Sequence, residues 1–350
     1  MSAEISRTPT IDDVASAAGV SKSTVSRALL KQSRVSATTR QKVLAAAADL
    51  GYVPNVMASE LAQHSGGTIG LLLRDASNPA YGLLFTLLHQ EATAAGLRVV
   101  STTIGSGPGG RSQEQVAALD WLMGMRVSGL IVATGGVFSE QLQPFHERIP
   151  ILRAGRPEAT GYIHAVSYDE QHAGEQLGRL VAEAGHRRVA VLRTVPEVSY
   201  PEYVRGTAMI DALTERGIEP VEVEVTPETD GIAEALHLVC SAEATAVMCP
   251  NDMRQLALIR VFAEAGLHAP QDYSVTGYDG VTPGVDLLGL ATYRIGVETL
   301  AQRTVAHMKT LLAEEPAEPI REVVRGELLP GRTVAPPGSR QPGQTVPTDP

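Results

Sequence analysis

Residues 10–29, TIDDVASAAGVSKSTVSRAL, contain two short helical patterns that are separated by a tight turn. Thr10 is positioned to cap the first helix, with Asp13 three places on as in a capping box, and Gly19 ends this helix. Ser21 caps the second helix, which carries apolar residues at helical spacing. Two short helices joined by so short a turn predict a helix-turn-helix unit.

A third helical pattern follows in residues 36–50, SATTRQKVLAAAADL, which Ser36 caps and Gly51 ends. The three helices together predict a head domain over residues 8–53. A unit of this size buries little apolar surface, so we expect its stability to be marginal.

The head is basic although the whole chain is acidic. The formal net charge is -10 at pH 7, but no acidic residue lies between Asp13 and Asp49. That interval contains the cations Lys22, Arg27, Lys31, Arg34, Arg40 and Lys42. Because a protein must replace the counterions around phosphate to bind nucleic acid, the head is the part expected to meet DNA. The acidic remainder is repelled from phosphate.

Residues 54–67 separate the head from the rest of the chain. Pro54 breaks the preceding pattern, and Asn55 can cap a short helix over residues 56–63. An isolated helix needs ~12–15 residues to be stable in water, so this helix is expected to form only against a partner. We interpret the segment as a hinge.

From residue 68 onward the pattern alternates between apolar strands and helices. The predicted helices cover residues 83–95, 113–125, 171–184, 205–216, 230–241 and 252–265. Nearly continuous apolar strands that are linked by helices indicate parallel sheets covered on both faces, which is an α/β architecture. The strands lie at residues 68–75, 97–104, 128–134, 149–155, 165–169, 188–192, 221–225, 245–250 and 273–279.

The alternation occurs in two runs, which predict two similar lobes within a core of residues 68–330. Lobe one is expected to comprise residues 68–164 and 294–320, and lobe two residues 165–290 and 321–330. Ligands of open parallel sheets bind beyond the carboxyl ends of the strands, so the cleft between the lobes is the predicted binding site.

Other segments carry weaker signals. Residues 331–350 are rich in proline and glycine and are expected to form a disordered tail. Cys240 and Cys249 lack the close pairing of a redox or metal motif, and we expect two ordinary buried thiols.

The sequence argues against a membrane protein and against an enzyme. No apolar run reaches the ~20 residues that span a bilayer, and no secretory signal precedes the head, so a cytoplasmic location is expected. GSGPGG at residues 105–110 lacks the Lys-Ser/Thr of a P-loop and the spacing of GxGxxG. The histidines are scattered without metal-ligand spacing. We therefore predict no catalytic residues, no cofactor and no metal.

Phrases along most of the chain give a specific resemblance. TIDDVASAAGVSKSTVSRAL and VSATTRQKVLAAAADLGYVPN resemble the head of the lactose and galactose repressor (LacI/GalR) family of bacterial transcription regulators. The similarity continues through DASNPAYGLL, RVSGLIVA, IPILRAGRP, GHRRVAVL, CPNDMRQLALIRVFAEAGL and YSVTGYDG, over roughly residues 10 to 330. It implies a head, a hinge helix, and a two-lobed core like that of periplasmic sugar-binding proteins.

Chemistry and resemblance agree on the DNA contacts. The second helix would enter the major groove by its N-terminal end, where Lys22 and Ser23 can reach base edges and Arg27 can reach guanine or phosphate. Helix N-termini and hydroxyls suit phosphate oxygens. Alternatively, the hydroxyls only cap helices and the cations are solvated surface. The predicted DNA-binding residues are Thr10, Ser21, Lys22, Ser23, Thr24, Ser26, Arg27, Arg34, Val35, Ser36, Thr39, Tyr52, Asn55, Ser59 and Leu61.

In the hinge, Leu61 matches the family leucine that inserts into the minor groove at the centre of the operator. A leucine that packs on the core is the alternative. Ser59 stands where many members carry a basic or amide side chain, and Glu60 places a carboxylate near phosphate. These two departures predict a weaker hinge contact.

For the cleft, the resemblance implies that an effector binds Asn78, Tyr81, Gly155, Tyr203, Asn251 and Asp279. Acidic and amide groups recognise hydroxyl-rich ligands because they accept and donate paired hydrogen bonds. Asp279 could instead hold a loop.

Tyr203 stands where the family usually has a ligand-binding arginine, three places before Gly206. Tyrosine offers one hydroxyl and a flat apolar face in place of a fork of donors. We expect an effector less hydroxyl-rich than a free hexose, such as a glycoside, a nucleoside or a modified sugar. Packing at the start of a helix is the alternative role of Tyr203.

These expectations define a sequence-specific DNA-binding regulator, a repressor under the allosteric control of a small sugar or sugar derivative. Its partners would be double-stranded DNA with a pseudo-palindromic operator and a second copy of the chain, since a two-fold palindrome mirrors a homodimer. A solute-binding protein is one alternative, but it would not account for the helix-turn-helix head. A nucleotide-dependent α/β enzyme is the other, and the poor match of residues 105–110 to a glycine motif disfavours it.

Overall fold

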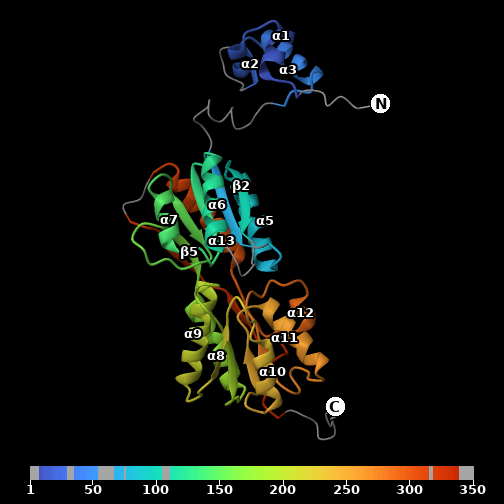
Figure 1. Ribbon diagram of the computed structural model, residues 1–350, viewed down its shortest axis with the longest axis vertical. Coiled ribbons are helices and arrows are strands. Elements are labelled where there is room, and N and C mark those ends of the chain that lie inside the picture. Colours follow the sequence, from blue (N-terminus) through green and yellow to red (C-terminus); the bar gives the residue numbers. More distant parts are fainter. Residues whose placement is uncertain are drawn as a thin grey trace. The chain divides into compact units, whose positions relative to one another are not determined.

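The computed structural model describes residues 8–29, 35–53, 67–74, 76–104, 111–314 and 318–338. The chain divides into two compact units, a head that ends at Gly66 and a core that begins at Gly67 (Figure 1). Some positions singled out in the sequence lie outside the described residues: Arg34, Asn55, Ser59, Leu61 and the glycine-rich segment 105–110.

The described part of the head contains three helices, as the sequence predicts: α1 (Ile11–Ala18), α2 (Lys22–Leu29) and α3 (Ala37–Asp49). Thr10 and Asp13 form the expected capping box, and the Ser36 side chain caps α3. The small core of the head is made by Val14, Ala15, Val25, Ala28, Val43 and Ala47.

The first lobe of the core is built on a six-stranded parallel sheet with strand order β11-β5-β4-β3-β1-β2. Helices α5 (Pro79–Ala94) and α13 (Val297–Leu311) cover one face, and α6 (Arg111–Gly124) and α7 (Ser139–His146) cover the other. Its strands are β1 (Thr68–Arg74), β2 (Arg98–Ile104), β3 (Gly129–Ala133), β4 (Ile151–Ala154), β5 (His164–Tyr168) and β11 (Arg321–Val324).

The second lobe contains a four-stranded parallel sheet with strand order β7-β6-β8-β9. In Figure 1, α8 and α9 lie together on one side of this lobe and α10, α11 and α12 on the other. A short antiparallel ribbon joins β10 (Thr292–Arg294) to β12 (Glu327–Leu329). The remaining elements are β6 (Val189–Thr194), β7 (Val221–Val225), β8 (Ala246–Met248), β9 (Ser274–Thr276), α8 (Glu170–Glu183), α9 (Tyr200–Thr214), α10 (Ile232–Cys240), α11 (Asp252–Glu264) and α12 (Val285–Leu288).

The predicted two-lobed α/β core with parallel sheets is therefore confirmed, but two strands differ from the expected division. The sequence assigned residues 165–290 and 321–330 to lobe two, whereas β5 and β11 pair with each other in the sheet of lobe one. The chain thus passes between the lobes at residues 168–170, 294–297 and 324–327. Strand partners decide this boundary, and the apolar pattern alone does not show them.

Two expectations based on composition need correction. Residues 331–338, expected in a disordered tail, pack on the second lobe, where the Thr333 Oγ1 hydroxyl donates to Val275 O at 2.7 Å and accepts from Ala291 N at 2.9 Å. These hydrogen bonds to backbone groups near β9 hold residues 331–338 in place, although the segment forms neither a helix nor a strand. Cys249 is buried as expected, but Cys240 is exposed at the end of α10. Among the described residues, no helix has the length and apolar composition needed to cross a bilayer.

Candidate functional site

The N-terminal end of α2 presents a cluster of hydroxyls on the surface of the head. Ser21 Oγ lies 2.9 Å from the hydroxyls of both Ser23 and Thr24, and it accepts a hydrogen bond from Thr24 N at 3.2 Å. Ser21, Lys22 and Ser23 are exposed, while Val25 is buried in the core of the head. The helix is therefore fixed by one side and offers its polar end to solvent.

The two cations of α2 make only weak contacts within the head. Lys22 Nζ pairs with Asp12 Oδ2 at 2.9 Å, and both side chains are exposed. Arg27 Nε donates to Ser23 O at 3.0 Å, which aligns Arg27 with Ser23 on one helix face. Exposed ion pairs contribute little to stability, so a phosphate could replace the carboxylate at small cost.

The other described positions of the predicted DNA surface fall into two groups. Thr10, Ser36 and Thr39 lie at the N-terminal ends of α1 and α3, where unpaired backbone amides attract anions. Val35 and Tyr52 instead pack in part against the core of the head. Ser26 is half-buried on α2.

A cavity of about 60 Å³ lies between the lobes of the core, and it brings together five of the six predicted effector residues. It forms where the carboxyl ends of parallel strands meet, as expected for an open sheet. Tyr203 does not line it. The lining residues are Asn78, Ala80, Tyr81, Leu84, Thr134, Gly135, Ala154, Gly155, Tyr168, Glu170, Ser199, Pro201, Glu202, Arg205, Asn251, Tyr278, Asp279 and Ile295.

Asp279 is held by its backbone rather than by its side chain. Its φ of 111° lies in a region that residues other than glycine rarely adopt. The buried Asp252 carboxylate fixes this loop by accepting hydrogen bonds from Gly280 N at 2.8 Å and Thr292 Oγ1 at 2.6 Å. Burial raises the pKa of Asp252 to about 6. Burial, reinforced by Asp252 and Glu202, also raises the pKa of Asp279 well above its usual range.

A buried ion pair joins α8 to α9 at one wall of the cavity. Gly174 lets the two helices approach closely, because a Cβ there would meet Ala208 Cβ. This approach brings Glu170 to Arg205, which also donates to Pro250 O at 2.6 Å. Burial disfavours the Arg205 charge, but Glu170 and the other nearby acids outweigh that effect and raise its pKa.

Asn251 and Glu202 link the cavity to a wider groove of about 470 Å³ on its outer side. Asn251 caps α11 with its Oδ1 and donates from Nδ2 to Glu202 Oε1 at 3.1 Å. Glu202 Oε2 accepts from the Thr194 hydroxyl at 2.8 Å. Asn78 likewise caps α5, so both predicted amides combine a capping role with a place in the cavity wall.

Direct contacts between the lobes lie beside the cavity. Arg74 Nη1 of the first lobe donates to Val198 O of the second at 3.3 Å, and Tyr200 N donates to Gly135 O at 3.4 Å. Position 135 requires glycine because a Cβ there would lie 2.9 Å from the Ser199 hydroxyl. These contacts join the two lobes beside the cavity.

Tyr203 lies outside the lining of this cavity, so its predicted contact with an effector stays a prediction. Its ring stacks on Tyr200 with centroids 6.5 Å apart, and the Arg193 guanidinium lies 5.0 Å from the centroid of the Tyr203 ring. Arg156 of the first lobe lies 5.0 Å from the Tyr200 ring. Tyr203 thus belongs to a column of side chains, Arg156, Tyr200, Tyr203 and Arg193, which spans the two lobes outside the cavity.

The sequence reasoning missed the charged groups of the cavity, Glu170, Glu202 and Arg205. Arg205 directly precedes Gly206, two places beyond the position at which the family pattern puts its arginine. Glu170 begins α8 immediately after β5, and Glu202 lies in the first turn of α9. The end of a strand followed by a helix is the signal that could have identified Glu170, because such ends line the cleft.

Comparison with known proteins finds matches to both the head and the core. Residues 10–55 match the model for bacterial regulatory proteins of the LacI family, and residues 179–334 match the periplasmic binding protein-like domain. Catabolite control protein A of Priestia megaterium is 30% identical over 279 residues, which cover 77% of this chain and 82% of that protein. The transcriptional regulator GalR of Escherichia coli is 28% identical over 335 residues, covering 94% and 96%.

Among solved structures, the Lac repressor dimer bound to operator and an anti-inducer aligns with a TM-score of 0.77 and 26% identity. The alignment covers 94% of this chain and 100% of that one. A helix-turn-helix head followed by a two-lobed binding core defines the class as a transcription regulator rather than an enzyme. The chain belongs to the LacI family of bacterial regulatory proteins, which confirms the resemblance seen in the sequence.

Proposed function

We propose that this regulator is a dimeric cytoplasmic repressor that binds a pseudo-palindromic operator and responds to a small sugar-like effector held between its lobes. The observation that carries the proposal is the interlobe cavity, which occurs in the same chain as the exposed polar end of α2. The first feature suits a small polar ligand and the second suits DNA.

In this proposal the N-terminal end of α2 enters the major groove. Lys22 and Ser23 lie at its exposed end and reach base edges, and Arg27, one turn further along, lies on the same face as Ser23 and reaches guanine or phosphate. The N-termini of α1 and α3 bind phosphates. Leu61 of the hinge inserts at the centre of the operator.

A dimer is supported by exposed apolar side chains of the second lobe. Leu287 and Leu288 on α12 are 85% and 52% exposed, and Met253 on α11 is 43% exposed. Large apolar side chains that are exposed in this way are typical of a surface that another chain covers. The Lac repressor similar to this chain is described as a dimer on its operator.

Control by the effector follows from the position of the cavity between the lobes. A ligand in the cavity contacts both lobes, so it stabilises the arrangement in which they are closed. A shift of the lobes moves the hinge segments of the two subunits relative to each other. A coupling free energy of ~1–3 kcal/mol would change the affinity for the operator by about 5- to 150-fold.

Operator binding tests the proposal directly. The affinity of the full chain for operator fragments, measured by fluorescence anisotropy, is expected to fall steeply with salt, and Arg27→Ala is expected to weaken it by at least ~1 kcal/mol. Arg216→Ala, an exposed arginine in the core, is the matched control and should change nothing. Binding that is independent of salt, or equal losses in both variants, would refute the assignment of the head.

A further inference from the structure

The cavity between the lobes is lined by more acidic than basic side chains. Its described lining includes the three carboxylates of Glu170, Glu202 and Asp279 and a single cation, Arg205. Arg205 is already paired with Glu170. Two carboxylates therefore face the cavity without an ion-pair partner among the described residues.

Asp279 is the less satisfied of these two carboxylates. Its residue is only 9% exposed, and within the described part of the chain its side chain accepts no hydrogen bond. Because Asp279 lines the cavity, its carboxyl group is free to accept hydrogen bonds from a ligand there. Glu202 receives hydrogen bonds only from the neutral groups of Thr194 and Asn251.

Aromatic rings complete the surroundings of Asp279. Tyr81 and Tyr168 line the same cavity from the first lobe. Tyr278 also lines it, but one face of its ring is covered by Arg205 at 3.4 Å and another by Tyr293, stacked at 5.9 Å. Electron-rich ring faces beside carboxylates attract ammonium groups.

We propose that the effector carries a positively charged amine, as an amino sugar does, and that its ammonium group binds beside Asp279 and Glu202. This inference rests on the proposed function, since it names the class of ligand for the same cavity. The inner cavity of about 60 Å³ has room for a small group, because a single water needs ~10–15 Å³. The hydroxyl-bearing remainder extends into the outer groove of about 470 Å³. Phosphate esters and acidic sugars are expected to bind more weakly than amines beside these two acidic side chains.

Protonation gives the proposal a distinct signature. In the empty cavity, burial and the neighbouring acids raise the pKa of Asp279. An ammonium group beside it favours the charged carboxylate and lowers that pKa, so binding of an amine releases a proton and a neutral ligand releases none. The groups that face Asp279 from the packed elements are Tyr81, Tyr168, Glu170, Glu202, Arg205 and Asp252.

The test uses the full chain and matched pairs of probes. Glucosamine, galactosamine and ethanolamine are compared with glucose, galactose and ethylene glycol by thermal shift and calorimetry, with glucose 6-phosphate as the anion. At least one amine should bind tenfold or more tighter than its neutral partner, a ratio equivalent to ~1.4 kcal/mol. Calorimetry in buffers of different ionisation enthalpy should show proton release for that amine. If no amine stabilises the protein, or if the neutral partner binds as tightly, the proposal is wrong.

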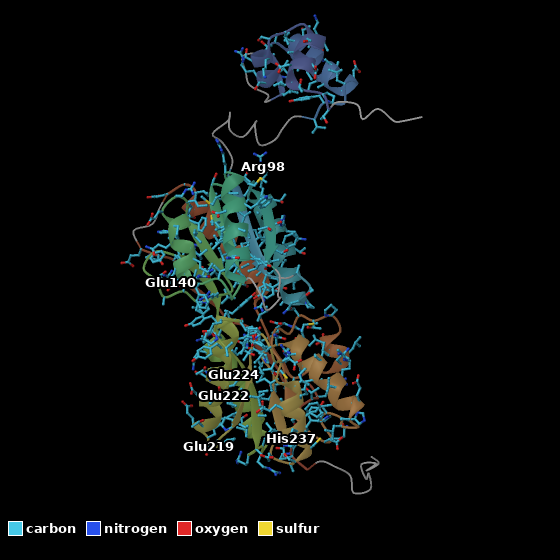
Figure 2. The ribbon with its side chains drawn as sticks, viewed as in Figure 1. Arg98, Glu140, Glu219, Glu222, Glu224 and His237 are labelled. Carbon is cyan, nitrogen blue, oxygen red and sulfur yellow. The ribbon has the colours of Figure 1, made fainter. Side chains whose placement is uncertain are left out.

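A pair of variants identifies the site of the preference. Asp279→Asn should abolish the preference for the amine, whereas Glu219→Gln should preserve it. Glu219 is an exposed carboxylate at the end of the second lobe that is far from the first lobe (Figure 2). Retention of the preference in Asp279→Asn would overturn the assignment. Operator binding is measured separately, so an intact salt-dependent affinity for DNA with no preference for amines would reject this inference alone.

Discussion

The two lobes contribute unlike chemistry to the cavity between them. The described residues of the first lobe that line it, such as Asn78, Tyr81, Thr134 and Tyr168, carry no formal charge. All charged lining groups come from the second lobe, on α8, on α9 and in the loop after β9. The difference indicates that the second lobe supplies electrostatic recognition, while the first lobe encloses the ligand with rings and neutral hydrogen-bonding groups.

The largest loss of stability is expected from removing the buried ion pair of the second lobe. Arg205→Met leaves the Glu170 carboxylate buried without its partner, and removal of one member of a buried pair costs about 3–5 kcal/mol. Urea unfolding of the full chain measures the loss, read from the transition of the core. Ligand binding to the cavity should be lost as well.

The matched control for this variant is Arg193→Met in the same lobe. Arg193 Nε pairs with Glu222 at 2.7 Å on the partly exposed surface of β6 and β7, where such pairs contribute at most ~1 kcal/mol. Comparable losses in the two variants would show that charge burial in the cavity is not what distinguishes the second lobe.

A substitution in the first lobe is expected to change the free energy of unfolding in the opposite direction. The Tyr168 hydroxyl is buried and has no hydrogen-bond partner within the described chain. In the empty protein it therefore lowers the stability of the fold, and a ligand in the cavity would supply the missing hydrogen bond. Tyr168→Phe should raise the free energy of unfolding of the empty protein by ~1 kcal/mol and weaken ligand binding. A destabilised empty protein would mean that the hydroxyl is already satisfied.

The smallest effect is expected at the contact between the lobes. Tyr200→Ala removes the ring beside Arg156 of the first lobe, a contact of about 0.5–1 kcal/mol, so the affinity for ligand should fall by about 2- to 5-fold. Tyr203→Ala, which alters the same column without touching the first lobe, should leave that affinity unchanged. Calorimetry measures the affinity for ligand in both variants. A larger loss of affinity in Tyr203→Ala would show that Tyr203 contacts the ligand.

The sequence predicts the head and most elements of the core up to residue 279 because their signals are local, but it assigned no helix to α7 or α13 and no strand to β10, β11 or β12. Caps such as Thr10 and Ser36 and continuous apolar strands such as residues 68–74 depend on neighbouring residues alone. Strand partners are set at long range, and for that reason β11 was assigned to the wrong lobe. The order of residues 331–338 was missed because Thr333 is held by distant groups near β9.

The cavity could be predicted only in part. Asn78, Asn251 and Asp279 follow strand ends, so their convergence follows from the topology of parallel sheets. The pairing of Glu170 with Arg205 depends on how closely α8 approaches α9. Gly174 permits this approach, but a glycine in the sequence does not predict it. Arg205 lines the cavity and Tyr203 does not, because a shift of two positions along a helix turns a side chain to a different face.

The central claim is that a ligand in the interlobe cavity controls the affinity of the head for DNA. The most direct test measures operator affinity by fluorescence anisotropy with and without a saturating cavity ligand, in the wild type and in Asp279→Asn. We expect a change of about 5- to 150-fold in the wild type and none in Asp279→Asn at the same ligand concentration. A ligand that binds the cavity tightly but leaves the operator affinity of the wild type unchanged would contradict the account.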